Sequence, residues 1–110
     1  MNQGKYVFSQ LMSFVSHNDF IACVQRYSGD YKVKDFTCWK QFLCMAFGQL
    51  THRESLSDTI LCLSGLEGKL YHLGIGKAIS KSTLSTANEK RDWRIYADLA
   101  QLLIADAKRL

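Results

Sequence analysis

Apolar residues recur three and four positions apart along most of this 110-residue chain, a spacing that places them on one face of an α-helix. No segment shows the sustained apolar and polar alternation of a half-buried strand, and residues 30–36, which are briefly strand-like, are interpreted as a connector. With 47% hydrophobic and 22% charged residues, the composition is typical of a globular chain. The sequence therefore predicts an all-α fold, a compact bundle of about five to six short helices forming a single domain over residues 1–110.

The first two predicted helices are short and amphipathic. The apolar face of the first comprises Phe8, Leu11, Met12 and Val15. The second repeats this spacing at Phe20, Cys23, Val24 and Tyr27. Asn18 or Asp19 can cap the start of the second helix, and Gly29 is expected to end it.

The third predicted helix is the most apolar and is expected to form the centre of the core. It begins after Thr37, and its stripe is wide enough to be buried on two sides: Trp39, Phe42, Leu43, Ala46, Phe47 and Leu50. Thr51 and Glu54 have the spacing of a capping box, in which the two side chains bond to each other's free backbone amides. This box predicts the start of a fourth helix, which continues over residues 55–63.

Four closely spaced glycines predict an irregular segment over residues 64–79, with one helical turn at the sequence KLYHL. Ser80 is a good N-cap for a fifth helix that begins at Lys81, and Ile79 can contact Leu84 as a hydrophobic staple.

Asp92 can cap a sixth helix. Its inward stripe is predicted to comprise Tyr96, Leu99, Ala100 and Leu103, widened by Ile95 and Leu102. Trp93 is interpreted as packing the last two helices together, and stacking against a DNA backbone is the alternative.

The fifth predicted helix is unusually polar for a domain of this size. Only Leu84 and Ala87 point inward on a helical wheel, and the run SKSTLSTANEKR holds nine Ser, Thr, Asn, Lys or Arg residues against one acid. Such a surface suits double-stranded DNA, because hydroxyls and cations reach phosphate oxygens while Asn, Arg and Lys can pair with base edges. The residues predicted at a DNA interface are Lys81, Ser82, Thr83, Ser85, Thr86, Asn88, Lys90 and Arg91. From composition alone, a merely solvated face is the commoner interpretation.

The charge distribution gives weak support for a polyanionic partner. The formal charge is +4, and residues 77–110 hold seven Lys or Arg against four acids, compared with seven against six in residues 1–76. The fourth and fifth helices would form a helix-turn-helix-like pair, although their connection of about 16 residues is longer than the usual three or four.

The cysteines and the N-terminus exclude several other classes. Cys23, Cys38, Cys44 and Cys62 lie in apolar helical patterns without a CxxC pair, so they are interpreted as buried free thiols and no metal site is predicted. No signal peptide is recognisable, and no apolar run approaches the ~18 residues of a membrane span. The cytoplasm is the expected location, and no cofactor or small-molecule ligand is expected.

Several runs of the sequence resemble a known family. The most specific are FTCWKQFLCMAFGQLTHRESL and STLSTANEKRDW, supported by VFSQLMSFV and KLYHLG. They are similar to the N-terminal domain of bacterial insertion-sequence transposases of the Asp-Asp-Glu superfamily, in the group typified by the fourth-numbered insertion sequence. The shared pattern is an aromatic-rich helix, a Thr-x-Arg-Glu-Ser-Leu-x-Asp turn and a Ser-x-Ser-Thr-Leu-x-x-Ala-Asn-Glu-x-Arg helix, and nearly the whole chain takes part.

The resemblance implies a DNA-binding module that recognises the terminal inverted repeats of an insertion sequence during transposition. It also implies that catalysis lies outside this chain, in a downstream ribonuclease-H-like domain whose carboxylates hold two divalent metals. A protein–protein module that assembles a homodimer through the third or the last helix is the alternative. A small enzyme is a third possibility, but the sequence shows no nucleophile with a partnered histidine.

Overall fold

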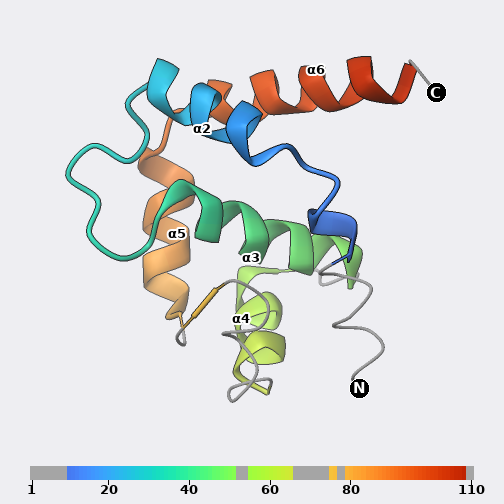
Figure 1. Cartoon of the computed structure of the whole chain (residues 1–110). Coiled ribbons are helices and arrows are strands. Elements are labelled where there is room, and N and C mark those ends of the chain that lie inside the picture. The colour runs from blue at the N-terminus through green and yellow to red at the C-terminus, as the bar shows by residue number, and fades with distance from the viewer. Residues whose placement is uncertain (1–9, 52–54, 66–74, 77–78, 109–110) are drawn as a thin grey trace.

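The computed structural model describes residues 10–51, 55–65, 75–76 and 79–108 (Figure 1). In this part of the chain the regular structure is helical and no strand occurs. The helices are α2 His17–Arg26, α3 Cys38–Leu50, α4 Leu56–Ser64, α5 Lys81–Lys90 and α6 Arg94–Lys108. The predicted all-α fold is confirmed.

Helix α3 is the centre of the fold, with α2 and α6 along one of its sides and α4 and α5 on the other (Figure 1). The cluster shared with α2 and α6 consists of Phe20, Cys23, Val24, Cys38, Ile95 and Leu99. The cluster shared with α4 and α5 consists of Phe36, Leu43, Cys44, Phe47, Leu63, Ile75, Leu84 and Ala87. The prediction that the third helix is buried on two sides is therefore confirmed, except at Leu50, which is exposed at the end of α3.

Aromatic rings join α3 to α2 and α6. Phe20 meets Trp39 edge to face with ring centroids 5.0 Å apart, and Phe42 stacks on Tyr96 at 6.5 Å. Both geometries are favourable for the quadrupoles of aromatic rings. Trp39 and Phe42 are half-buried and pack against the cluster around Phe20, so they serve as core residues.

Four helices begin at side-chain caps, and two of these caps differ from the prediction. The hydroxyl oxygens of Thr37 and Ser80 cap α3 and α5 as expected. The cap of α2 is Ser16, whose Oγ accepts the backbone N–H of Asp19 at 3.3 Å. The prediction of Asn18 or Asp19 is wrong because the helix begins at His17, which places both residues inside its first turn.

The predicted capping box at Thr51 is also wrong. Helix α3 continues to Leu50, so Thr51 is the C-cap of that helix, and its hydroxyl donates to the carbonyl oxygen of Phe47 at 2.6 Å. Ser55 caps α4 instead, accepting the N–H of Asp58 at 3.1 Å. Residues 52–54 and the predicted turn at KLYHL lie outside the described residues.

The end of α2 shows why a glycine is needed at position 29. The left-handed residue after the helix is Ser28, with φ of 53°, and not Gly29 as the helix-stop prediction implies. A Cβ on Gly29 would lie 2.5 Å from Cδ1 of Ile95 and 2.8 Å from Sγ of Cys38, closer than atoms can pack. Gly29 therefore permits the connector to pass directly over the contact between α3 and α6.

The predicted first and last helices are partly corrected. Residues 10–12 are helical and are followed by a turn, whereas Phe8 lies outside the described residues. In α6 the buried positions are Ile95 and Leu99, while Ala100 and Leu102 are exposed because the second half of the helix extends beyond the body of the domain (Figure 1). No helix among the described residues is both long and apolar enough to cross a membrane.

Candidate nucleic-acid interface

Helix α5 turns a hydroxyl-rich and cationic face to solvent. Leu84 and Ala87 are buried against α3 and α4, as predicted from the helical wheel. On the outer side, the exposed members of the predicted interface are Lys81, Ser82, Thr83, Thr86, Asn88 and Lys90, and Ser85 is half-buried. At the start of the helix, the Ser80 hydroxyl accepts the N–H of Thr83 at 3.1 Å and lies 2.8 Å from the Thr83 hydroxyl.

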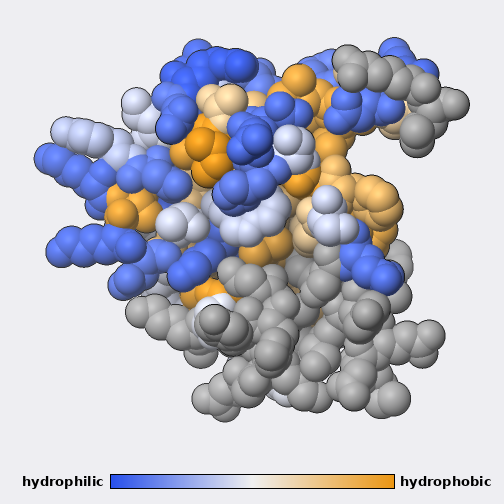
Figure 2. All heavy atoms as spheres, viewed as in Figure 1, coloured by the Kyte–Doolittle hydropathy of each residue, from blue (hydrophilic) through white to orange (hydrophobic). Residues whose placement is uncertain are grey.

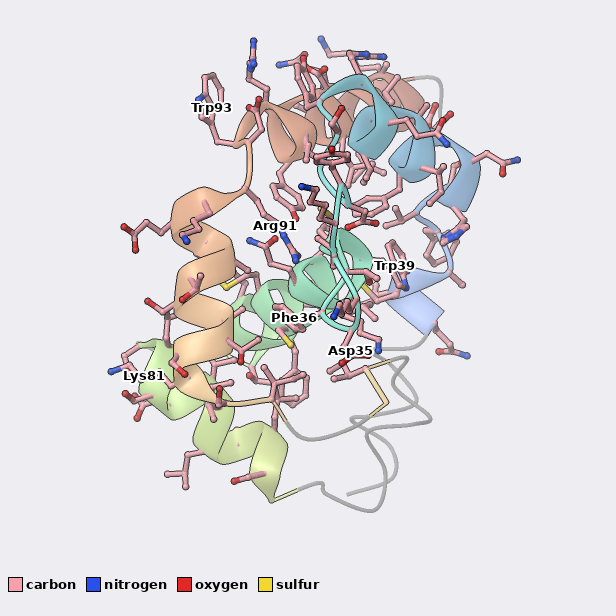
Figure 3. All side chains as sticks on the ribbon, turned by 90° about the vertical axis from the view of Figure 1, so that its left-hand side faces the viewer. Asp35, Phe36, Trp39, Lys81, Arg91 and Trp93 are labelled. Carbon is pink, nitrogen blue, oxygen red and sulfur yellow. The ribbon has the colours of Figure 1, made fainter. Side chains whose placement is uncertain are left out.

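The exposed face of α5 is one wall of a groove. Residues 28–36, which connect α2 to α3, form the opposite wall, and the start of α6 closes one end (Figure 3). The groove has a volume of about 1170 Å³, and the α5 residues that line it are Ser82, Thr83, Thr86, Ala87, Lys90 and Arg91. Hydrophilic side chains gather on this side of the molecule, on the left in Figure 2.

The charges along the groove are mostly positive. The charged side chains that line it are three cations, Lys90, Arg91 and Arg94, and one carboxylate, Asp92. Arg94 engages both oxygens of that carboxylate, at 3.0 and 2.7 Å. Lys81 and Lys90 form no ion pair with any residue that the structure describes, so their charges face solvent without compensation.

Two of the predicted interface residues are tied to α3 instead of pointing freely outward. Asn88 accepts the Gln41 amide at 2.7 Å, and Arg91 donates to Gln41 Oε1 at 3.2 Å and to the carbonyl oxygen of Phe36. Tyr96 also donates to Gln41 Oε1, at 2.7 Å. Arg91 is the C-cap of α5, where the backbone becomes extended, and this turn directs its side chain over the start of α3.

Gln41 is the centre of this network, and the sequence analysis did not identify it. Its side chain is only 4% exposed, yet its amide and carbonyl are both bonded, to groups from α5, from the turn after it and from α6. A polar residue within an apolar helical stripe is the one signal that could have indicated it, since such residues need partners when buried. Burial also raises the pKa of the Tyr96 hydroxyl well above its usual value, which keeps it a neutral donor.

The interpretation of Trp93 as a residue that packs the last two helices together is wrong. Its side chain is 73% exposed at the turn between α5 and α6, so it does not pack these helices together (Figure 3). Tyr31, in the connector on the opposite wall, is equally exposed at 73% and was not recognised from the sequence. Both side chains line the groove.

Helices α4 and α5 pack against each other, as expected of the helix-turn-helix-like pair. The chain between them lies largely outside the described residues.

The sequence profile of a domain of unknown function (DUF4372) matches residues 3–76 of the chain. The chain belongs to this family. No curated protein and no solved structure matches it. The matched region contains α2, α3 and α4, whereas α5 and α6, which carry the exposed polar face and one end of the groove, follow it along the chain.

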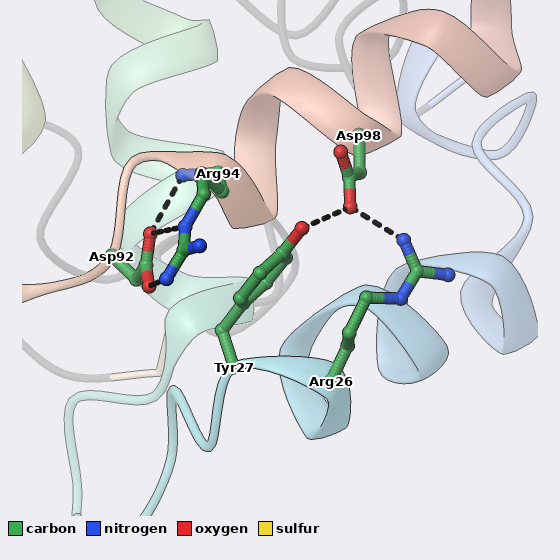
Figure 4. A network of polar contacts seen from close by, with 5 residues as sticks. All are labelled: Arg26, Tyr27, Asp92, Arg94 and Asp98. Carbon is green, nitrogen blue, oxygen red and sulfur yellow. Dashed lines mark hydrogen bonds and ion pairs between the residues drawn. The ribbon is translucent and has the colours of Figure 1, made fainter.

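A polar network beside the groove joins the end of α2 to α6 (Figure 4). Asp98 accepts from the Tyr27 hydroxyl at 2.7 Å and from Arg26 at 2.5 Å, and Arg94 lies over the Tyr27 ring at 4.6 Å. The hydrogen bond from Tyr27, with the charge of Arg26, holds the pKa of Asp98 below its usual value, and Arg94 lowers the pKa of Asp92 in the same way. The network links the end of α2 to the first turns of α6.

These lowered pKa values predict an acid-sensitive contribution to stability. A carboxyl whose pKa is lower in the folded chain stabilises it above the unfolded value and loses that effect as the pH falls through the folded pKa, here below about pH 4. We expect Asp98→Asn to lower the free energy of unfolding at pH 7. The variant should also lose less stability than the wild type as the pH falls from about 4 to about 2. Urea denaturation at each pH measures both effects. Glu89→Gln, which removes an exposed carboxylate outside the network, is the control. Parallel pH profiles for wild type and Asp98→Asn would contradict this role.

The cysteines are free, and the three within α2 and α3 are buried. Burial raises the pKa of Cys38 to about 11 and that of Cys44 to about 12, so these thiols stay protonated at neutral pH. Among the described residues there is no group of three or more His, Cys, Asp or Glu side chains that could hold a metal ion.

Proposed function

We propose that this chain is a DNA-binding module that contacts double-stranded DNA through the outer face of α5. The observation that carries the proposal is the exposure of Lys81, Lys90 and the intervening hydroxyls, with no carboxylate of the described residues paired to either lysine. Hydroxyls and cations are the groups that bind phosphate oxygens, and they supply most of the affinity for duplex DNA. Arg91 and Asn88 hold α5 on α3 in this proposal.

We further propose a biological target for this DNA-binding module. The runs that resemble the N-terminal domain of insertion-sequence transposases favour the terminal inverted repeats of such an element as the DNA. In that setting the module needs no cofactor and carries out no chemistry, because strand cleavage belongs to the downstream metal-dependent domain of that family.

Lysine replacements test the proposal. We expect Lys81→Ala and Lys90→Ala each to weaken binding to any duplex and to reduce the slope of log K against log salt by about 1, because each loses about one phosphate contact. Near 0.1 M salt this corresponds to a loss on the order of tenfold per residue. The measurement is a mobility-shift or anisotropy titration with the terminal repeat and with a scrambled duplex.

Lys108→Ala is the matched control, since this lysine is exposed in the last turn of α6, far from α5 (Figure 1). An unchanged salt slope in both α5 variants would contradict the proposed interface. Equal affinity for the terminal repeat and the scrambled duplex would be consistent with DNA binding but would contradict the terminal repeats as its target.

A homodimerisation module is the alternative, and one observation favours it. The projecting half of α6 exposes Leu102 and Ile104, and Phe14 is also exposed in the turn before α2. Exposed apolar side chains that gather into one patch mark association surfaces, and a homodimer through the last helix would bury these. Sedimentation that depends on concentration, together with no shift of either duplex, would support this alternative against DNA binding.

A further inference from the structure

The groove beside α5 is larger than most small-ligand pockets. Its volume of about 1170 Å³ exceeds the 300–1,000 Å³ or so that encloses a small ligand, and it is open to solvent. One wall carries the hydroxyls of Ser82, Thr83 and Thr86, and the other is formed by residues 28–36 (Figure 3). An open groove between two walls has room for a segment of a chain molecule.

An unbalanced cation lines this groove. The Arg91 guanidinium is partly buried, and its hydrogen-bond partners, Gln41 Oε1 and the carbonyl oxygen of Phe36, are neutral. No carboxylate of the described residues pairs with it. Buried charges in proteins are normally compensated, and Lys90 beside it adds a second cation that no carboxylate of the described residues pairs. The pair favours an anion in the groove.

Two large aromatic side chains are exposed along the same groove. Trp93, in the turn before α6, and Tyr31, in the connector, both line it, and each is 73% exposed. Aromatic faces beside cations are the combination that binds single-stranded nucleic acid, because every base can stack on a ring. The bases of an intact duplex are covered by their neighbours in the stack, so they cannot reach these rings.

We propose that the groove binds an unpaired stretch of DNA, with phosphates at Arg91 and Lys90 and bases stacked on Trp93 and Tyr31. This inference rests on the proposed function and deepens it, since it states that the preferred DNA has an unpaired strand next to the duplex contacted by α5. Stacking makes the site tolerant of sequence, so it contributes affinity for a DNA structure and not for particular bases.

A tailed duplex tests the inference. Three labelled probes are titrated by fluorescence anisotropy: a blunt duplex of about 20 base pairs, the same duplex with a tail of about four thymidines, and an oligothymidine of about 12 nucleotides. We expect the tail to tighten binding by about tenfold, within the range reported for stacking of one or two bases. Trp93→Ala and Tyr31→Ala should each remove most of this gain and leave the affinity for blunt duplex unchanged.

Phe14→Ala is the matched control, because Phe14 is an equally exposed aromatic residue that does not line the groove. It should change neither affinity. Trp93→Phe keeps a ring for stacking, so it should retain the gain while abolishing the quenching of tryptophan fluorescence by oligothymidine.

The outcomes separate this inference from the proposed function. Equal binding of blunt and tailed duplex by the wild type, or a gain that persists in both alanine variants, would overturn the groove assignment and leave duplex binding intact. Binding of oligothymidine that depends on Trp93, without any binding of blunt duplex, would overturn the duplex proposal and retain the groove. Failure of all three probes to bind would overturn both.

Discussion

Phe20→Ala is expected to lower the free energy of unfolding by about 3–5 kcal/mol, the range for removing a buried phenylalanine ring. Phe20 is fully buried, and its ring contacts Trp39, Phe42 and Tyr96 from two other helices. A domain of this size has a total stability of roughly 5–15 kcal/mol, so the variant loses a large part of it. Urea denaturation followed by circular dichroism measures the effect.

Phe14→Ala provides the matched control for Phe20→Ala. Phe14 is 80% exposed in the turn before α2, so its loss should change the free energy of unfolding by no more than about 0.5 kcal/mol. If both variants lose similar stability, Phe20 does not have the central place in the packing that its ring contacts indicate.

Leu84→Ala is expected to cost about 2–5 kcal/mol and to affect α5 most. Leu84 and Ala87 are the only side chains that α5 buries, and Leu84 is much the larger, so it provides most of the apolar attachment of this polar helix to α3 and α4. Hydrogen exchange of the α5 amides should accelerate more than that of the α2 amides, because opening of α5 leaves the cluster around Phe20 intact.

Leu61→Ala is the control for Leu84→Ala, since Leu61 is 72% exposed on α4 and should be replaceable at little cost. The Leu84 variant also bears on DNA binding. If α5 carries the interface, the remaining folded protein should bind duplex more weakly as the helix opens. Uniform acceleration of exchange across α2 and α5 would show that the two clusters unfold as one unit.

The helical fold was predictable because its signals are local. The spacing of apolar residues predicts which face of α3 and α5 is buried, and Thr37 and Ser80 stand where a side-chain oxygen can reach the next free amide. One local signal was misleading. Thr51 has the right spacing to cap α4, but α3 continues as far as Leu50, which makes Thr51 the end of that helix.

The candidate site, too, was predictable only in its local features. The polar, acid-poor character of α5 follows from its sequence, since a helix with two inward apolar positions must expose the rest. The sequence could not indicate that Arg91 and Asn88 meet Gln41, about 50 residues earlier, because that contact depends on how α5 crosses α3. Nor could it indicate that Trp93 and Tyr31 border one groove, since two segments distant in sequence form its walls. The amino-acid sequence alone thus determined the helices and the chemistry of their faces, while tertiary packing decided which polar groups are used internally and which remain free to bind a partner.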